Sequence, residues 1–352
     1  MEALYTKALE LLKSLIATPS FSKEEDATAS IILGFLTKEG VSPQRFLNNV
    51  WAVNKHFDPA KETLMLNSHH DTVKPNNGYT RPPFEPMEEE DKLYGLGSND
   101  AGGPLVSLIA TFLHFFNEPD LSYNLLLVCS SEEEISGKNG IAAVIKEVPQ
   151  PSVAIIGEPT LMDMAIAEKG LMVLECTAHG KAGHAARDEG ENAIFNAMKD
   201  IEWFRTFSFP KVSQTLGPIK MTTTIIQAGS QHNVVPDRCS FTVDVRTTDA
   251  YSNEETLAII KQNIDSEINP KSLRLNPSSI DAGHTLVQAG KQLGMKTYGS
   301  PTLSDQSLIT IPSVKLGPGD SARSHTPDEF IYMKEVKEGI EKYIQLLTHF
   351  LF

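Results

Sequence analysis

The stretch LLLVCSSEEE, residues 125–134, leads from an apolar run through Cys129 and two serines to three consecutive carboxylates. Its first four residues are typical of a buried strand. Glu132, Glu133 and Glu134 repel one another, and a run of this kind normally lies on a solvated surface. Close carboxylates at the end of a buried strand are tolerated when a cation neutralises them. The stretch therefore indicates a strand that ends at a cation site.

Two further apolar runs end in the same way. SHHD, residues 68–71, follows one strand-like run, and GEP, residues 157–159, follows another. Strand-like and helix-like segments alternate through the first half of the chain, which is typical of a mainly parallel sheet covered by helices on both faces. Ligands bind beyond the carboxyl ends of the strands in such sheets. We therefore expect an α/β catalytic domain with its polar clusters gathered at one edge.

The pattern changes about half-way along the chain. The segments then follow in the order strand, helix, strand, strand, helix, strand, which is the order of the ferredoxin-like split βαβ motif. We expect the second helix of this α+β motif at 253–268 and its last strand at 272–275. Helix-like and strand-like segments of the kind found in the first half then return, so the smaller domain is inserted in the larger one. We predict catalytic segments at 1–169 and 281–352, and an inserted lid or dimerisation domain at 170–280.

The composition excludes several classes of function. The chain of 352 residues has a formal net charge of -14 and no cluster of Lys and Arg that would bind phosphate, so we expect no nucleic-acid partner. Cys129, Cys176 and Cys239 lie in apolar stretches and are expected to be reduced core residues. No apolar run approaches the roughly 18 residues of a membrane span, and the amphipathic N-terminal helix lacks the apolar core of a signal peptide. A cytoplasmic protein without a membrane partner is expected.

Histidines and carboxylates are the candidate ligands at the expected sheet edge. His69 and His70 follow the first strand, Asp100 lies in the turn GLGSNDAGG at 95–103, and His325 lies in a polar loop near the C-terminus. Imidazole combined with carboxylate favours zinc, with cobalt or manganese as alternatives. A pair of cations needs one shared carboxylate, and the remaining residues supply one histidine and one carboxylate to each cation. We therefore predict a site for two divalent metal ions.

The glycine-rich turn also permits a different interpretation. A nucleotide-dependent oxidoreductase would use such a turn to bind NAD and would carry no metal. The spacing of the glycines, however, fits neither the dinucleotide-binding fingerprint nor the P-loop. Metal analysis of the purified protein separates the two interpretations.

Five motifs together resemble those of the dinuclear zinc amidohydrolase and exopeptidase family. This family includes acetylornithine deacetylase, succinyl-diaminopimelate desuccinylase, aminoacylase and glutamate carboxypeptidase. The motifs occur in family order over nearly the whole chain: SHHDTV, GSNDAGG, SSEEE, IIGEPT and SHTPDE. The resemblance implies a catalytic domain that carries an inserted lid domain, and a homodimer formed through that insert.

The resemblance assigns roles to residues of the catalytic domain. It makes five residues the metal ligands: His69, Asp100, Glu134, Glu158 and His325. Asp100 would be shared by both ions, and its peptide bond to Ala101 would be cis. Asp71 would orient the ring of His69, and Glu133 would be the catalytic base.

Two of these assignments stay open on the sequence alone. If the family motif is aligned one residue further along Glu132–Glu134, the catalytic base and the metal ligand change places. His70 is a second imidazole beside His69 and could be the ligand in its place. The chain also departs from the family pattern at Lys74, which interrupts the usual Val-Pro pair after the first motif.

The resemblance extends to the insert. The motif GKAGHAA, residues 180–186, resembles the lid-domain motif whose histidine, here His184, helps to stabilise the developing oxyanion, usually in the partner subunit's site. Asn233 matches a residue that assists this histidine. Arg246 matches a position suited to the bidentate binding of a substrate carboxylate.

The last motif indicates the reaction. GPGDSARSHTPDEF, residues 317–330, most resembles the biosynthetic deacylases of N-acyl amino acids, with acetylornithine deacetylase as the leading match. We therefore expect removal of an acetyl or succinyl group from a small N-acyl amino acid, and N-acetylornithine and arginine biosynthesis are the leading substrate and pathway. N-acyl-citrulline, N-acyl-lysine and succinyl-diaminopimelate are alternative substrates. A di- or tripeptidase of the same family is an alternative activity.

Overall fold

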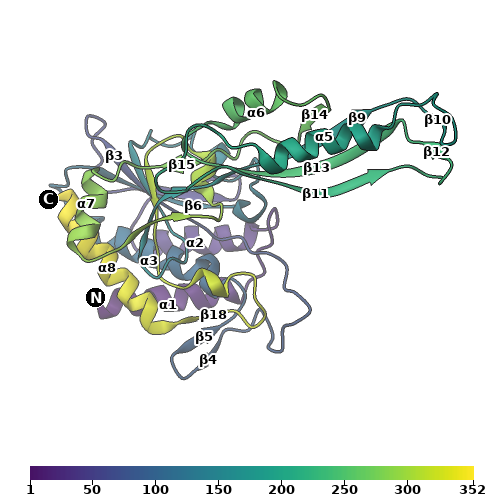
Figure 1. The fold of residues 1–352 in the computed structure, drawn as a ribbon. Coiled ribbons are helices and arrows are strands. Elements are labelled where there is room, and N and C mark those ends of the chain that lie inside the picture. Colours follow the sequence, from purple (N-terminus) through teal and green to yellow (C-terminus); the bar gives the residue numbers. More distant parts are fainter. The chain divides into compact units, whose positions relative to one another are not determined.

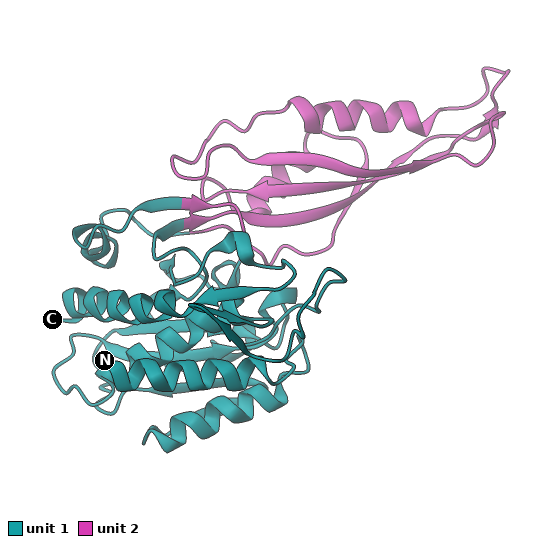
Figure 2. Ribbon diagram, turned by 90° about the horizontal axis from the view of Figure 1, so that it is seen from below, with its two compact units in different colours: residues 1–166, 279–298, 304–352 teal, residues 167–278, 299–303 magenta.

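The structure is a computed structural model that describes residues 1–352. The chain forms two compact units (Figure 2). Unit 1 consists of residues 1–166, 279–298 and 304–352, and unit 2 consists of residues 167–278 and 299–303. The chain leaves unit 1 after Ile166 and returns to it at Ser279, and a short segment of five residues, 299–303, belongs to unit 2 again.

A mainly parallel sheet forms the centre of unit 1. Its strand order is β1-β2-β6-β3-β7-β17-β8-β15, and β16 pairs with β8. The strands β6, β3, β7 and β17 are parallel, whereas β1, β2 and β8 are antiparallel to their neighbours. The bounds are β1 (Gln44–Phe46), β2 (Asn49–Val53), β3 (Thr63–His69), β6 (Asn124–Ser130), β7 (Val153–Ile156), β8 (Met164–Glu168), β15 (Ser278–Ser279), β16 (Thr297–Ser300) and β17 (Ser313–Lys315).

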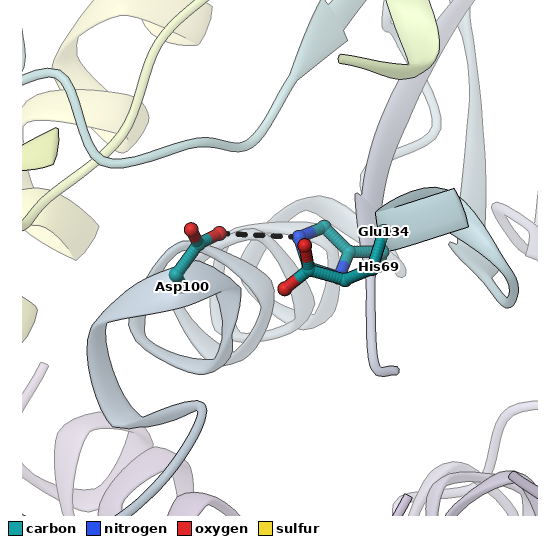
Figure 3. A group of neighbouring side chains, drawn as sticks. All are labelled: His69, Asp100 and Glu134. Carbon is teal, nitrogen blue, oxygen red and sulfur yellow. Dashed lines mark hydrogen bonds and ion pairs between the residues drawn. The ribbon is translucent and has the colours of Figure 1, made fainter. Parts of the chain in front are cut away.

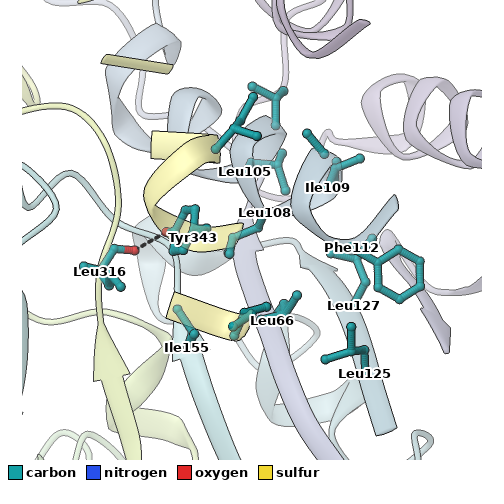
Figure 4. Close-up of a cluster of buried hydrophobic side chains, with 14 of the residues drawn as sticks. Leu66, Leu105, Leu108, Ile109, Phe112, Leu125, Leu127, Ile155, Leu316 and Tyr343 are labelled. Atoms are coloured by element: carbon teal, nitrogen blue, oxygen red, sulfur yellow. Dashed lines mark hydrogen bonds between the residues drawn. The ribbon is translucent and has the colours of Figure 1, made fainter. Parts of the chain in front are cut away.

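The central strands are buried on both faces. Leu66 of β3 and Leu127 of β6 lie in a core cluster with the long helices, whereas Met65 and Leu126 lie in a second cluster on the opposite face. This burial explains the continuous apolar runs of the sequence, because a strand covered on both sides needs no polar face. Figure 4 shows the first cluster, in which the Tyr343 hydroxyl donates a hydrogen bond to a backbone carbonyl oxygen.

Six helices belong to unit 1. In Figure 1, α1 and α8 lie against α3, which contacts β3 and β6. The much shorter α4 packs on the other face of the sheet. The bounds are α1 (Glu2–Ile16), α2 (Asp26–Lys38), α3 (Gly103–Phe115), α4 (Ile141–Val144), α7 (Thr285–Gln292) and α8 (Met333–Leu351).

A second, three-stranded sheet of unit 1 was not expected. It has the order β18-β5-β4, with bounds β4 (Met87–Glu89), β5 (Lys92–Tyr94) and β18 (Phe330–Tyr332). It pairs the segment before the Asp100 turn with the segment that follows His325. Two motifs that are distant in the sequence are therefore joined close to their polar residues.

Unit 2 has the expected ferredoxin-like order. Its antiparallel sheet has the strand order β11-β13-β9-β14, and α5 and α6 connect the strands. A two-stranded ribbon of β10 and β12 extends from it. The bounds are β9 (Gly170–His179), β10 (Gly183–His184), α5 (Ala193–Thr206), β11 (Lys220–Ala228), β12 (Val234–Val235), β13 (Arg238–Thr247), α6 (Asn253–Lys261) and β14 (Glu267–Pro270).

Two boundaries predicted in this unit were wrong. The second helix ends at Lys261 and not at 268, and the last strand is Glu267–Pro270 and not 272–275. The Asp200 carboxylate of α5 accepts hydrogen bonds from the backbone N–H groups of Asp265 and Ser266, at 3.2 and 2.9 Å. These bonds draw the chain away from a helical path and start the strand early.

Two further sequence predictions concern the whole chain. Cys129, Cys176 and Cys239 are free and buried, as expected for core cysteines. No helix of the structure has both the length and the apolar character that crossing a membrane requires.

Candidate metal centre

Three motifs meet at the carboxyl edge of the central sheet. In the parallel pair β3–β6, His69 lies opposite Ser130, which precedes the glutamate run. In the pair β3–β7, Asn67 lies opposite Ile156, which is two residues before Glu158. The strand register therefore places SHHD, SSEEE and GEP side by side.

His69 is at the centre of one group of possible ligands. Its Nε2 lies 3.3 Å from Asp100 Oδ1. It also lies 3.8 Å from Glu133 Oε2 and 3.8 Å from Glu158 Oε1. Figure 3 shows Asp100 and Glu134 beside this ring. Each of the three residues offers one possible ligand atom, and these three atoms lie within 4.8 Å of one another. The peptide bond from Asp100 to Ala101 is cis, as the resemblance implied.

His325 is at the centre of the second group. Its Nε2 lies 3.0 Å from Glu134 Oε2 and 3.7 Å from Asp100 Oδ2. Asp100 thus presents one carboxylate oxygen to each histidine. The structure brings all five predicted ligands together, with Asp100 between the two imidazoles.

The two adjacent histidines have different surroundings. His69 Nδ1 lies 2.9 Å from the backbone oxygen of Asp71 and 3.4 Å from the Asp71 carboxylate, which leaves Nε2 for the cluster. Both ring nitrogens of His70 are occupied, by the Thr28 hydroxyl and the Asn48 carbonyl oxygen, each at 2.9 Å. Burial lowers the pKa of His70 to about 4, so this ring is neutral at physiological pH. The geometry favours His69 over His70 as the ligand.

The glutamate run is held by Asp71. The Asp71 carboxylate accepts hydrogen bonds from the backbone N–H groups of Glu133 and Glu134, at 3.0 and 3.2 Å. Glu132 turns away from the cluster, and its carboxylate accepts hydrogen bonds from the backbone and side chain of Asn139. The register of the run therefore places Glu133 nearest His69 and Glu134 nearest His325.

The cluster is rich in negative charge. Burial raises the pKa of Glu133 and of Glu158 well above the usual range, and the repulsion between the two carboxylates adds to this effect. A hydrogen bond to Glu134 raises the pKa of His325 to about 9. Cations at this position would relieve the repulsion, and the donor set of imidazole and carboxylate suits two divalent metal ions.

The comparisons with known proteins agree with this geometry. Residues 65–349 match the model of peptidase family M20/M25/M40. The chain belongs to this family. It is therefore a metal-dependent hydrolase, and its site suits two divalent ions.

Several relatives of this M20 enzyme span nearly its whole length. The acetylornithine deacetylases of Shigella sonnei (strain Ss046) and Klebsiella pneumoniae (strain 342) are each 28% identical to it, and each match covers 97% of both chains. Aminopeptidase PepT from Bacillus cereus shares its fold, with a TM-score of 0.78, 16% identity and 98% coverage of both chains. The YXEP protein of Bacillus subtilis, described as a dinuclear metal binding peptidase of the M20 family, has a TM-score of 0.75 at 16% identity, covering 100% of this chain and 99% of its own.

Two buried carboxylates of the M20 enzyme were missed by the sequence reasoning. Glu329 accepts hydrogen bonds from the backbone N–H groups of Gly97, Asn99 and Asp100, at 2.8–2.9 Å, and so supports the turn that carries Asp100. Asp305 accepts a hydrogen bond from the Ser130 hydroxyl at 2.6 Å, and burial raises its pKa to about 7. Glu329 could have been found, because it is the last residue of the SHTPDE motif. No local signal marks Asp305.

The three candidate residues of the insert lie in unit 2. His184 is exposed in β10, and the backbone N–H of the next residue donates to the carbonyl oxygen of Asn233 at 3.0 Å. Arg246 of β13 makes a bidentate ion pair with Asp244, at 2.9 and 3.1 Å. The roles of His184, Asn233 and Arg246 stay predictions.

Proposed function

We propose that this M20 enzyme hydrolyses the amide bond of an N-acyl amino acid, releasing acetate or succinate, with N-acetylornithine as the leading substrate and arginine biosynthesis as the pathway. The observation that carries the proposal is the pair of imidazoles with Asp100 between them and Glu133 beside them. The full-length likeness to two acetylornithine deacetylases supports the choice of substrate.

The residues of the cluster have separable tasks in this proposal. His69, Asp100, Glu134, Glu158 and His325 would hold two divalent ions, for which we propose zinc, with cobalt or manganese as alternatives. When bound, these ions polarise the acyl carbonyl and lower the pKa of the attacking water.

Glu133 would move the proton. It takes a proton from the attacking water and delivers it to the nitrogen of the leaving amine, so that the amide C–N bond breaks and a carboxylic acid and a free amine result. Asp71 holds the backbone of Glu133 in place for this task. Glu134 is paired with His325 and is therefore assigned to the metal.

We further propose that the enzyme is a homodimer formed through unit 2. Phe195 and Met198 of α5 and Ile225 and Ile226 of the edge strand β11 are between 52% and 63% exposed. Exposed apolar groups on an unpaired edge strand are typical of a surface that a partner covers. In this assembly, His184 would stabilise the oxyanion with the help of Asn233, and Arg246 would exchange Asp244 for the substrate carboxylate.

A substrate panel tests the proposal. Zinc-loaded protein is assayed with the N-acetyl and N-succinyl derivatives of ornithine, citrulline, lysine and diaminopimelate, together with dipeptides and tripeptides. We expect turnover of at least one N-acyl amino acid and none in protein treated with a chelator. Hydrolysis of peptides alone would overturn the deacylase proposal in favour of a peptidase.

A further inference from the structure

The loop that carries His325 has a backbone conformation that its surroundings must maintain. His325 and Asp328 have φ values of 59° and 52°, in the left-handed region that residues other than glycine adopt only at a cost in energy. The side chain of His325 is 58% exposed, so packing does little to fix its ring. The position of this imidazole therefore depends on the contacts of neighbouring residues in the loop.

Arg323 makes such a contact two residues before His325. Its Nη1 and Nη2 donate hydrogen bonds to the two carboxylate oxygens of Glu335, at 2.9 and 2.6 Å, and Nη1 also donates to the backbone oxygen of Phe330 at 3.3 Å. Glu335 lies in the first turn of α8. Two parallel hydrogen bonds fix the direction of a guanidinium group as well as its distance from the carboxylate. Arg323 therefore joins the loop firmly to α8.

The surroundings of this ion pair favour arginine over lysine. The side chains of Arg323 and Glu335 are 14% and 16% exposed, so salt screens the pair less than it screens an exposed one. The guanidinium also lies over the rings of Phe330 and Tyr332, at 5.1 and 5.3 Å from their centres. A lysine carries a point charge and cannot form the paired hydrogen bonds while stacking on these rings. The pair is thus a specific connection between the loop and α8.

The same loop reaches one group of candidate metal ligands. The Thr326 hydroxyl donates a hydrogen bond to the backbone oxygen of Arg323 at 2.7 Å, so that the two residues on either side of His325 are tied together. His325 Nε2 lies 3.0 Å from Glu134 and 3.7 Å from Asp100. A displacement of Arg323 would therefore move the imidazole relative to these carboxylates.

The other candidate histidine does not depend on this loop. His69 is the last residue of β3, and its side chain is 1% exposed. The backbone oxygen of Asp71 lies 2.9 Å from its Nδ1 and holds the ring. Loss of the Arg323–Glu335 pair should thus affect one metal position and spare the other.

We propose that Arg323 and Glu335 are positioning residues for the metal ion that His325 would hold. Neither residue would touch that ion. Together they keep the loop in the conformation that presents the imidazole to Glu134 and Asp100, so that occupancy of this position depends on α8. The inference rests on the metal centre of the proposed function and adds to it a residue, Glu335, that lies outside the five motifs.

Metal binding without turnover tests this inference. Metal-free protein is titrated with zinc in competition with a chelating dye, which gives a Kd for each of the two ions. Arg323→Met should weaken one Kd by about 10–100-fold, as for other residues that orient a ligand, and should change the other by less than about twofold. His325→Ala should lose the affected ion, and Arg323→Met in that background should leave the remaining Kd unchanged.

Further variants separate positioning from a general loss of stability. Glu335→Gln should reproduce the selective effect of Arg323→Met, and Arg323→Lys should weaken the same ion to a smaller extent. The matched control is Lys337→Met, because Lys337 lies in the same helix but pairs with Glu2 of α1 at 2.9 Å. This control should change neither Kd. Circular dichroism at the titration temperature checks that each variant is folded, and Arg323→Lys, which keeps the charge, carries the test if Arg323→Met does not fold.

Three results would overturn the inference. The first is equal weakening of both ions by the Arg323 variants, and the second is no change in either Kd. The third is an effect of Arg323→Met that persists at full size in the His325→Ala background. A wild-type protein that binds fewer than two ions would overturn the metal centre itself. The substrate panel tests the deacylase function separately, because these titrations need no turnover.

Discussion

Asp71 connects the first motif to the glutamate run, because its two carboxylate oxygens bind the backbone of the two glutamates that face the metal centre. The third glutamate, Glu132, has a left-handed φ of 55° and points to Asn139. Gly137 leaves room for this side chain, since a Cβ there would lie 2.0 Å from Glu132 Oε2. Adjacent residues of one type therefore have separate environments.

This difference predicts separate effects of two isosteric substitutions. Glu133→Gln should lower kcat by at least about 100-fold, in the range of a lost general base, and should retain two metal ions per chain. Glu134→Gln should lower the metal content towards one ion. The measurements are steady-state kinetics and metal analysis of purified protein. Activity of Glu133→Gln within about tenfold of the wild type would refute its role as the base.

The neighbouring histidines His69 and His70 provide a second pair of variants whose expected effects differ. His70→Ala removes two buried hydrogen bonds and should lower the free energy of unfolding by about 1–3 kcal/mol, with the metal content unchanged. His69→Ala should lose metal instead. Denaturant unfolding and metal analysis of both variants give the comparison, and loss of metal from the His70 variant alone would reverse the assignment.

At the scale of elements, the turn that carries Asp100 depends on β18, because Glu329 directly precedes that strand. Glu329→Gln replaces a carboxylate that accepts three backbone hydrogen bonds, so the turn should hold Asp100 less firmly. We expect metal affinity to fall by about 10–100-fold, as for other residues that support a ligand, in a competition titration with a chelating dye. Asp328→Asn is the matched control, because Asp328 binds Thr80 and Arg81 instead. An equal effect of both variants would contradict a specific role for Glu329.

The edge strand β11 predicts an effect on assembly. Ile225→Asp should convert a dimer to a monomer in sedimentation experiments, because it places a charge in the exposed apolar surface of unit 2. Val212→Asp, at a residue of unit 2 that is 57% exposed and lies outside the helices and strands, serves as the control. A wild-type protein that sediments as a monomer would refute the dimer itself.

The elements that could be predicted from the sequence are those whose pattern follows from burial on both faces. The runs at β3, β6 and β7 are of this kind. The strands β15 and β16 were missed because they are short and their pairing depends on tertiary contacts rather than on a local pattern. The end of α6 depends on Asp200, an acceptor more than 60 residues upstream.

The predictability of the site differs from residue to residue. The five candidate ligands and Glu133 belong to motifs with a recognisable order, so the sequence could predict that they would lie together. Asp305 could not, because nothing adjacent to it in the sequence indicates that it is buried beside Ser130. The hydrogen bonds of His70 could not be predicted either, because both of its partners, Thr28 and Asn48, come from other segments of the chain.

For the whole molecule, metal removal and pH should act together. In the metal-free protein, burial raises the pKa of Asp305 to about 7 and that of Glu329 to about 8, above the ordinary values near 4. A carboxyl group with a raised pKa binds its proton more tightly in the folded state, so its contribution to stability is lost as pH rises from about 4 to about 8.

The expected result is a melting temperature of metal-free protein that falls over this pH range. Zinc-loaded protein should show a smaller decrease, because bound cations favour the charged carboxylates. Thermal unfolding with and without a chelator, at half-unit pH steps, measures both curves, and adding zinc back should restore the loaded one. Parallel curves for the two forms would contradict the prediction.

The two histidines of the centre differ in how firmly the fold holds them. The side chain of His69 is 1% exposed at the end of a central strand, whereas that of His325 is 58% exposed on a loop. An ion held by His325 should therefore exchange with the surroundings faster than one held by His69. The ion that exchanges slowly would stay bound during dialysis. The occupancy of the other site would vary with the free metal concentration, and the catalytic rate would vary with it.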